Sequence, residues 1–260
     1  EKPQPRLNRA ILHLMRGNLK DGWRDYAARL KISGKAPVCD HGLPAWTGGS
    51  LNGKRLLVSA EQGIGDQLMF ASMIPELSRR ATEEGGSIIL ECEPRLVSLF
   101  ARSFPDITVR PSQMEARSGA VYSNYAWLKA AGGANLAIEM GTLPRHLRKD
   151  IESFLAPHVY LDADETEILN WQHALSKSAA APFIGICWRS GKITNGRSLQ
   201  FAPLEMWAAF IRDMPGTPVC FQYDASSEEV EMLSRLAGRA VVVPNGVYQI
   251  SAYRKVTLFP

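Results

Sequence analysis

A run of glycine and polar residues that follows an apolar stretch contains the residue types that could do chemistry. Its members are Glu61, Gln62, Gly63, Gly65, Asp66 and Gln67. Glycines let the backbone turn tightly and approach a ligand, and a helix beginning at Asp66 would add free N–H groups and a partial positive charge. At the mouth of a sheet, the Asp66 carboxylate could take a proton from an attacking hydroxyl. We therefore predict a cleft loop with Asp66 as its catalytic base. The alternative is that Asp66 only caps a helix, a position that aspartate favours.

A second group of residues could bind phosphate. The apolar stretch 183–188, expected to be a strand, leads into a glycine-bearing basic loop. The residues of interest in this loop are Arg189, Ser190, Lys192 and Arg197. Guanidinium and ammonium groups form charge-assisted hydrogen bonds to phosphate oxygens, so the loop suits a diphosphate. A solvated basic loop without a ligand is the alternative.

Arg145 and Arg148 form a third candidate group. They stand close enough in the sequence to share one face of a helix. We predict them as possible contacts to an acceptor substrate, while a role as ordinary surface residues fits the pattern equally well.

Other kinds of site are disfavoured by their spacing. The glycine pattern of the cleft loop lacks a third glycine, since Met69 stands near its place, and Glu91 and Glu93 are the nearest candidates for an acid that binds ribose. The stretch 48–55 precedes its strand and has arginine after the lysine instead of serine or threonine, which argues against a P-loop. The five histidines show no metal-ligand spacing, so we expect no metal and no cofactor.

Composition bounds the class of protein. The chain has 260 residues, of which 45% are hydrophobic and 22% charged, which is ordinary for a folded protein. A net charge of +4 suits an anionic ligand such as a nucleotide phosphate, but the chain has no Lys/Arg run that would indicate nucleic acid. No apolar run approaches the ~18–20 residues of a membrane helix. The four cysteines form no CxxC pair, which favours free thiols and a cytoplasmic location. Because the chain lacks an initiator methionine, we expect a fragment or a trimmed protein.

The order of apolar patterns predicts an α/β protein preceded by helices. Helical spacing over 6–32 breaks at Gly17, and the alternation of strands and helices from residue 54 onward indicates parallel sheets with helices on their faces. One helix is expected over 66–82 and a strand over 240–244. The predicted segments are a helical hairpin (1–34), a linker anchored by Trp46 (35–53), a first α/β domain (54–162) and a partial second one (163–260).

At several of these places the chain resembles a known family. The motifs are Gly17–Tyr26, Glu61–Phe70, Leu143–Arg145, Tyr160–Leu161 and Ile184–Gly191. The first is similar to the end of a tetratricopeptide array. Together they resemble bacterial tetratricopeptide proteins whose C-terminal part is similar to the lipopolysaccharide heptosyltransferases and, more distantly, to the O-linked N-acetylglucosamine transferases. The run Glu61–Phe70 is the most specific of these motifs.

The resemblance implies a GT-B architecture, in which two Rossmann-like domains face each other across a cleft. The first domain would hold the acceptor, with Asp66 as the base. The second would hold the nucleotide-sugar, with Arg189, Lys192 or Arg197 on the diphosphate. Such enzymes need no metal, because cations and helix N-termini take up the phosphate charge. The relatives continue beyond the strand 240–244 with a glycine-rich donor motif, and this sequence does not, so the second domain is expected to be incomplete.

Three functions remain open at this point. The first is a glycosyltransferase-like protein that moves a sugar from a nucleotide-sugar to a hydroxyl of a protein or glycan, with protein partners recruited by the helices. The second is a catalytically inactive scaffold that combines tetratricopeptide helices with a degenerate GT-B region. The third is a nucleotide-binding oxidoreductase, which the missing third glycine disfavours.

Overall fold

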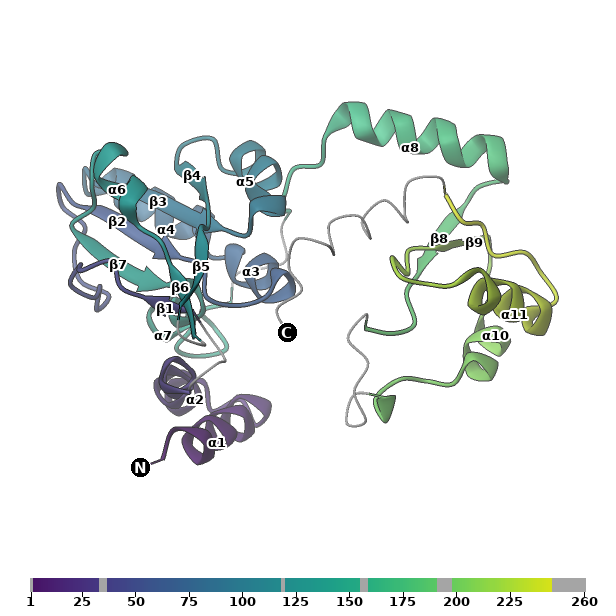
Figure 1. Ribbon diagram of the computed structural model, residues 1–260, viewed down its shortest axis with the longest axis horizontal. Coiled ribbons are helices and arrows are strands. Elements are labelled where there is room, and N and C mark those ends of the chain that lie inside the picture. Colours follow the sequence, from purple (N-terminus) through teal and green to yellow (C-terminus); the bar gives the residue numbers. More distant parts are fainter. Residues whose placement is uncertain (1, 33–36, 118–119, 155–158, 191–197, 245–260) are drawn as a thin grey trace. The chain divides into compact units, whose positions relative to one another are not determined.

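The computed structural model shows an α/β protein with parallel-strand sheets (Figure 1). The structure describes residues 2–32, 37–117, 120–154, 159–190 and 198–244. The chain divides into two compact units, Glu1–Ala163 and Asp164–Pro260. Among the residues described, no helix has the length and apolar character needed to cross a membrane.

The main sheet of the first unit has four parallel strands. They are β2 (Arg55–Ser59), β3 (Ser87–Cys92), β4 (Thr108–Pro111) and β7 (Leu136–Glu139), in the order β4-β3-β2-β7. Because β2 is the first of the four in the chain and pairs with β3 on one side and β7 on the other, the strand order reverses beside it. At such a point, open parallel sheets form a ligand-binding crevice outside the carboxyl ends of their strands. The sheet is compatible with a Rossmann-like fold, although the sequence pattern does not predict β7.

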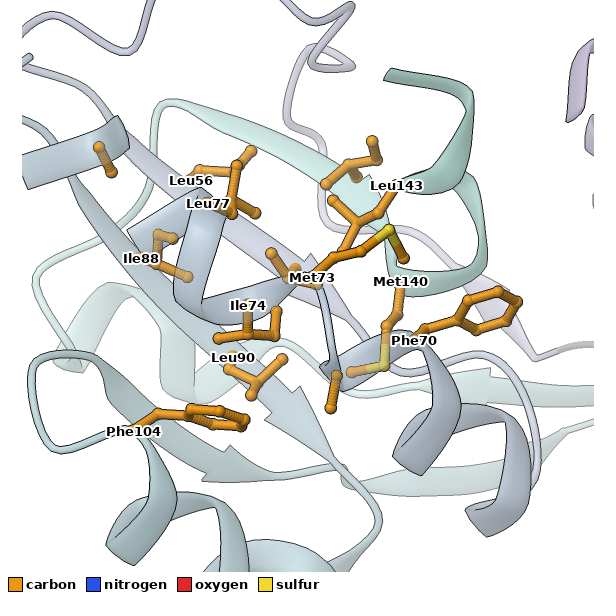
Figure 2. Packing of buried hydrophobic residues seen from close by; sticks show 14 of the residues in the cluster. Leu56, Phe70, Met73, Ile74, Leu77, Ile88, Leu90, Phe104, Met140 and Leu143 are labelled. Carbon is orange, nitrogen blue, oxygen red and sulfur yellow. The ribbon is translucent and has the colours of Figure 1, made fainter. Parts of the chain in front are cut away.

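Both faces of this sheet are covered by apolar side chains. Leu56 and Val58 of β2 join the larger core cluster, and Leu57 between them joins a smaller cluster on the other face. Figure 2 shows the larger cluster, where the labelled residues are Leu56, Phe70, Met73, Ile74, Leu77, Ile88, Leu90, Phe104, Met140 and Leu143. A strand buried on both faces is typical of a parallel sheet whose two sides are covered by helices and loops.

Two short helices follow β2 where the apolar spacing predicts one helix over 66–82. They are α3 (Ile64–Ala71) and α4 (Ile74–Glu83). The break coincides with Pro75, which lies in the first turn of α4. Proline has no N–H to donate and its ring clashes with the preceding turn, so it is tolerated at a helix start and not in the interior. The expectation of a single helix is therefore wrong.

The first unit also contains shorter helices and a second, smaller sheet. The helical ones are η2 (Pro94–Leu96), α5 (Val97–Ser103), α6 (Ala126–Ala130), η3 (Met140–Thr142) and α7 (Pro144–Leu147). A second sheet has the order β1-β6-β5, from β1 (Val38–Cys39), β6 (Ala120–Ser123) and β5 (Met114–Arg117). The predicted linker contains β1, and its Trp46 and Leu51 are buried in the larger cluster. The expectation that Trp46 anchors this segment is confirmed.

Helical elements, which we call the N-terminal helices, precede these sheets. They are α1 (Pro3–Met15), α2 (Leu19–Tyr26) and the short η1 (Ala27–Lys31). Asp25 of α2 is 1% exposed and accepts hydrogen bonds from Arg9 Nε (2.7 Å) and Arg6 Nε (3.0 Å) of α1. Gly22 permits the close approach of the two helices, because a Cβ there would lie 2.6 Å from Leu14 Cδ2. Their likeness to tetratricopeptide repeats stays a prediction.

The second unit is smaller and has its own core. Its elements are α8 (Glu165–Ser178), β8 (Phe183–Ile186), α10 (Leu204–Asp213), β9 (Thr217–Cys220) and α11 (Ser227–Ala237). Strands β8 and β9 pair in parallel, and Val219 also forms a bridge with Val242. The strand expected over 240–244 is thus only a single bridge among the described residues. Strand β8 ends at Ile186, so the strand expected over 183–188 is shorter and Trp188 lies beyond it. Trp188 is nevertheless buried in this core, as expected for a member of the apolar stretch.

Candidate active site at the glycine turn

Asp66 lies in the first turn of α3, directly outside the carboxyl end of β2. The helix begins at Ile64 with Gly63 as its N-cap, so the expectation that it begins at Asp66 is wrong. Asp66 is not the N-cap residue either, although its carboxylate accepts hydrogen bonds from the backbone of the helix start, at Gly63 and at Asp66 itself. Gly63 and Gly65 are exposed, while Asp66 is half-buried. The turn therefore presents two glycines and a carboxylate at the point where the strand order of the sheet reverses.

The surroundings of Asp66 favour its protonated form. Burial raises the pKa of the Asp66 carboxyl above its ordinary value, and the negative charge of Glu61 raises it further. Hydrogen bonds from the backbone at Gly63 and at Asp66 itself oppose this rise. A carboxylate with increased proton affinity in a half-buried site has the character that a general base requires.

Glu61 lies next to this turn and joins three parts of the fold. It is 3% exposed, and its Oε1 accepts hydrogen bonds from Arg29 Nη2 and from the backbone N of Gly141, both at 2.9 Å. Gly141 follows β7 and Arg29 belongs to η1, so Glu61 connects β2, β7 and the N-terminal helices. Arg29 Nη2 also donates to Thr142 Oγ1 at 2.9 Å. Glu61 is therefore placed to shape the turn, since its Oε1 already accepts hydrogen bonds from two other parts of the fold.

The two glutamines of the cleft loop connect the turn to neighbouring elements by hydrogen bonds. Gln62 Oε1 accepts a hydrogen bond from Tyr26 OH at 3.1 Å. Gln67 is buried; its Nε2 donates to Gln62 O at 2.7 Å, and its Oε1 accepts from the backbone N of Glu93 at 2.8 Å. These contacts tie the turn to α2 and to the end of β3. Of the predicted loop residues, Asp66 is thus the acidic one that remains partly open to solvent.

Gly141 leaves room for this polar network. A Cβ at Gly141 would lie 2.3 Å from Gln62 Nε2 and 2.6 Å from Glu61 Oε1. We expect Gly141→Ala to lower the free energy of unfolding by about 2 kcal/mol, because overpacking a buried site displaces its side chains. Urea unfolding followed by circular dichroism measures this change.

The matched control is Gly65→Ala in the same turn. A Cβ there has no described atom within 4 Å, and the position is helical. Its stability should stay equal or rise by less than about 1 kcal/mol, because alanine favours helices over glycine. Equal losses for the two variants would show that the Gly141 contacts are unimportant.

Glu91 is a buried acid that supports the turn from β3. It is fully buried, and its Oε2 accepts hydrogen bonds from the backbone N of Ala60 and from Tyr125 OH, both at 3.2 Å. Its Oε1 is buried and has no hydrogen-bond partner among the described residues. Burial raises the pKa of Glu91 to about 7, although both hydrogen bonds oppose the rise. Ala60 immediately precedes the cleft loop, so the protonation state of Glu91 bears directly on it.

Arg189 lies where the sequence predicts, after β8, but its charge is already paired. Its Nε and Nη2 donate to the two carboxylate oxygens of Glu229 at 2.9 and 2.6 Å, and its Nη1 lies 2.9 Å from Asp224 Oδ2. The side chain of Arg189 is 14% exposed. A diphosphate would have to compete with these carboxylates for the guanidinium. Ser190 is half-buried beside it, and Lys192 and Arg197 lie outside the described residues.

Arg145 and Arg148 do not share a helical face. Helix α7 ends at Leu147, so Arg148 is its C-cap. Arg148 is buried and its Nη1 donates to Glu76 Oε2 at 2.7 Å, whereas Arg145 is exposed. Arg148 therefore attaches α7 to α4, and Arg145 is the one of the pair that solvent or a ligand can reach.

Sequence reasoning missed several residues of this site. Arg29 and Gly141 reach Glu61 from 32 and 80 positions away, and no local pattern marks such contacts. Glu91 carried a readable signal, because a charged residue that ends the apolar stretch Ile88–Leu90 must be exposed or specifically paired.

The chain is similar over most of its length to part of a known protein. It is 29% identical over 240 residues to Protein FlbA of Caulobacter vibrioides, an alignment that covers 92% of this chain and 40% of that protein. The chain thus spans about two fifths of the length of this relative. No protein-family model matches the chain. No solved structure matches it either.

Proposed function

We propose that this chain is a glycosyltransferase region that moves a sugar from a nucleotide-sugar to a hydroxyl of a protein or glycan, without a metal. The observation that supports it most is the placement of Asp66. Its carboxylate is half-buried, has a raised pKa and stands in the first helical turn beyond β2, where the strand order reverses. Parallel α/β sheets bind ligands at this point.

In the proposed reaction, Asp66 acts as the general base. The acceptor oxygen forms a bond to the anomeric carbon of the sugar, and its proton passes to the Asp66 carboxylate. The bond between that carbon and the diphosphate oxygen breaks, and the nucleoside diphosphate leaves with the bonding electron pair. Gly63 and Gly65 leave room for a substrate beside the carboxylate, because neither carries a side chain and both are exposed.

The second unit would bind the nucleotide-sugar, in a GT-B arrangement of two Rossmann-like domains. Its strand β8, which pairs in parallel with β9, leads into the loop with Arg189 and Ser190. Arginine suits a diphosphate because its planar fork can donate two parallel hydrogen bonds to phosphate oxygens. In this proposal Arg189 exchanges a carboxylate partner for the diphosphate, with Lys192 and Arg197 as further cations.

The ion pairs of Arg189 favour a second function. Because Glu229 and Asp224 already compensate the charge of Arg189, the chain could instead be a catalytically inactive scaffold whose N-terminal helices bind protein partners. In that case the ion pairs of Arg189 serve only to hold α11 against the end of β8.

A calorimetric titration with a panel of nucleotide-sugars and with free UDP, ADP and GDP tests the proposal. We expect saturable binding by the chain, and at least about tenfold weaker binding by Arg189→Ala, since a hydrogen bond to a charged group contributes roughly 1.5–3 kcal/mol.

Glu229→Gln is the matched control, because it breaks the same ion pair and glutamine preserves the capping box that Glu229 forms with Ser226. This variant should bind at least as tightly as the unaltered chain, because the guanidinium is released. Weakening by both variants would assign Arg189 a structural role, and a folded chain that binds no nucleotide would favour the scaffold.

A further inference from the structure

We infer that Arg29 is a positioning residue through which the N-terminal helices control the base at the glycine turn. This inference rests on the proposed function, because it concerns the same Asp66. Arg29 would act by holding and neutralising Glu61, the acidic neighbour of Asp66, so that removing Arg29 would change how Asp66 ionises without any direct contact between the two.

The contacts of Arg29 show that it is built into the sheet edge and does not lie on the surface. It is 6% exposed, and its guanidinium carbon lies 4.6 Å from the centre of the Tyr26 ring. Its Nη1 donates to the carbonyl of Tyr26 at 3.3 Å, and its Nη2 donates to Glu61 and Thr142 as described above. The N-terminal helices therefore deliver a buried cation to the point where β2 and β7 end.

Glu61 links Arg29 to Asp66, because it pairs with Arg29 and its negative charge acts on the Asp66 carboxyl. Its side chain is 1% exposed and forms its ion pair with Arg29 at 2.9 Å. A buried carboxylate without a compensating cation repels negative charge nearby. Among the described residues, the titratable and charged groups that contact this point are Tyr26 on α2, Arg29 on η1, Glu61 in the turn and Glu139 at the end of β7, whose Oε2 accepts from Thr142 at 3.3 Å. Of these four groups, Arg29 is the one that carries a positive charge.

The sign of the effect follows from this arrangement. Glu61 already raises the pKa of Asp66 through its negative charge. When Arg29 is replaced by a neutral residue, that charge is no longer compensated, so the pKa of Asp66 should rise further. When Glu61 is replaced by glutamine, the pKa of Asp66 should fall.

The test measures the ionisation of Asp66 in the whole chain, by recording its carboxyl ¹³C NMR signal during a pH titration. The Asp66 signal is assigned as the one that Asp66→Asn lacks. We expect a higher pKa of Asp66 in Arg29→Gln, a lower one in Glu61→Gln, and a value close to that of Glu61→Gln in the double variant. Arg6→Gln is the control, because Arg6 of α1 is likewise an arginine of the N-terminal helices that pairs with a buried carboxylate, that of Asp25, and its replacement should leave Asp66 unchanged.

These outcomes separate the inference from the proposed function. A pKa of Asp66 that stays the same in both Arg29→Gln and Glu61→Gln overturns the inference. If Arg29→Gln does not fold, the double variant decides, since it leaves neither Glu61 nor Arg29 as an unpaired buried charge. A pKa of Asp66 in the double variant that equals that of the unaltered chain then overturns the inference. The predicted shifts in a chain that transfers no sugar would support the positioning role of Arg29 and count against the proposed function. Where transfer occurs, the acid limb of its pH profile should move in the same direction as the NMR pKa.

Discussion

Replacing Asp66 by asparagine is expected to lower the rate of sugar transfer by about 10²- to 10⁴-fold, the usual contribution of a general base. Asparagine has nearly the same shape as aspartate, and its Oδ1 can still accept the backbone hydrogen bonds that the carboxylate accepts. The amide cannot take up the proton of an acceptor hydroxyl. Folding and nucleotide binding should therefore be retained while turnover is lost.

The measurement is the transfer rate as a function of pH, with the donor identified by titration. For the unaltered chain, the acid limb should lie above the ordinary pKa of an aspartate, because burial and the charge of Glu61 raise the pKa of Asp66. Glu93→Gln is a suitable control, since Glu93 follows β3 at the same edge of the sheet but forms an ion pair with Arg95. Undiminished transfer by Asp66→Asn would remove Asp66 from the mechanism.

Replacing Glu91 by glutamine is expected to make the chain more stable at pH 8 and leave its stability nearly unchanged at pH 4.5. The pKa of Glu91 rises from its ordinary value of 4.5 to about 7 in the folded chain. The folded state therefore binds this proton more tightly than the unfolded state does. The stabilisation is fully present below pH 4.5 and is lost as the pH rises through about 7.

The size of this effect follows from the two pKa values. A rise from 4.5 to about 7 corresponds to about 3 kcal/mol of unfolding free energy lost between acidic and alkaline pH. Glutamine resembles the protonated acid, and its oxygen can accept the hydrogen bonds from Ala60 and Tyr125, so the variant avoids this loss.

Urea unfolding between pH 4.5 and 8 measures the difference. Glu152→Gln, which alters an exposed carboxylate of the same unit, should leave the pH dependence of stability unchanged. Parallel stability curves for the Glu91 variant and the unaltered chain would show that Glu91 is ionised in the folded state at neutral pH.

Local sequence patterns predicted much of the fold, because local interactions decide it. Strands β2 and β3 come from continuous apolar stretches, which predict strands by themselves. Helix α11 is marked at its start by Ser226 and Glu229, which form its capping box, and at its end by Gly238, which is its left-handed C-cap. The errors also have local causes. Pro75 divides the expected helix, and β7 is a four-residue strand too short to show a period.

Site prediction was limited by contacts between distant parts of the chain. The sequence by itself determined the glycine turn, the carboxylate of Asp66 and the basic residue that follows β8, since each depends on neighbouring residues. Only the tertiary structure decided that Arg29 and Gly141 meet Glu61, that Glu91 stays buried beneath Ala60 and that Arg189 is held by Glu229. The physical reason is that burial and charge pairing depend on strand order and helix packing, which bring together groups that no short-range periodicity relates.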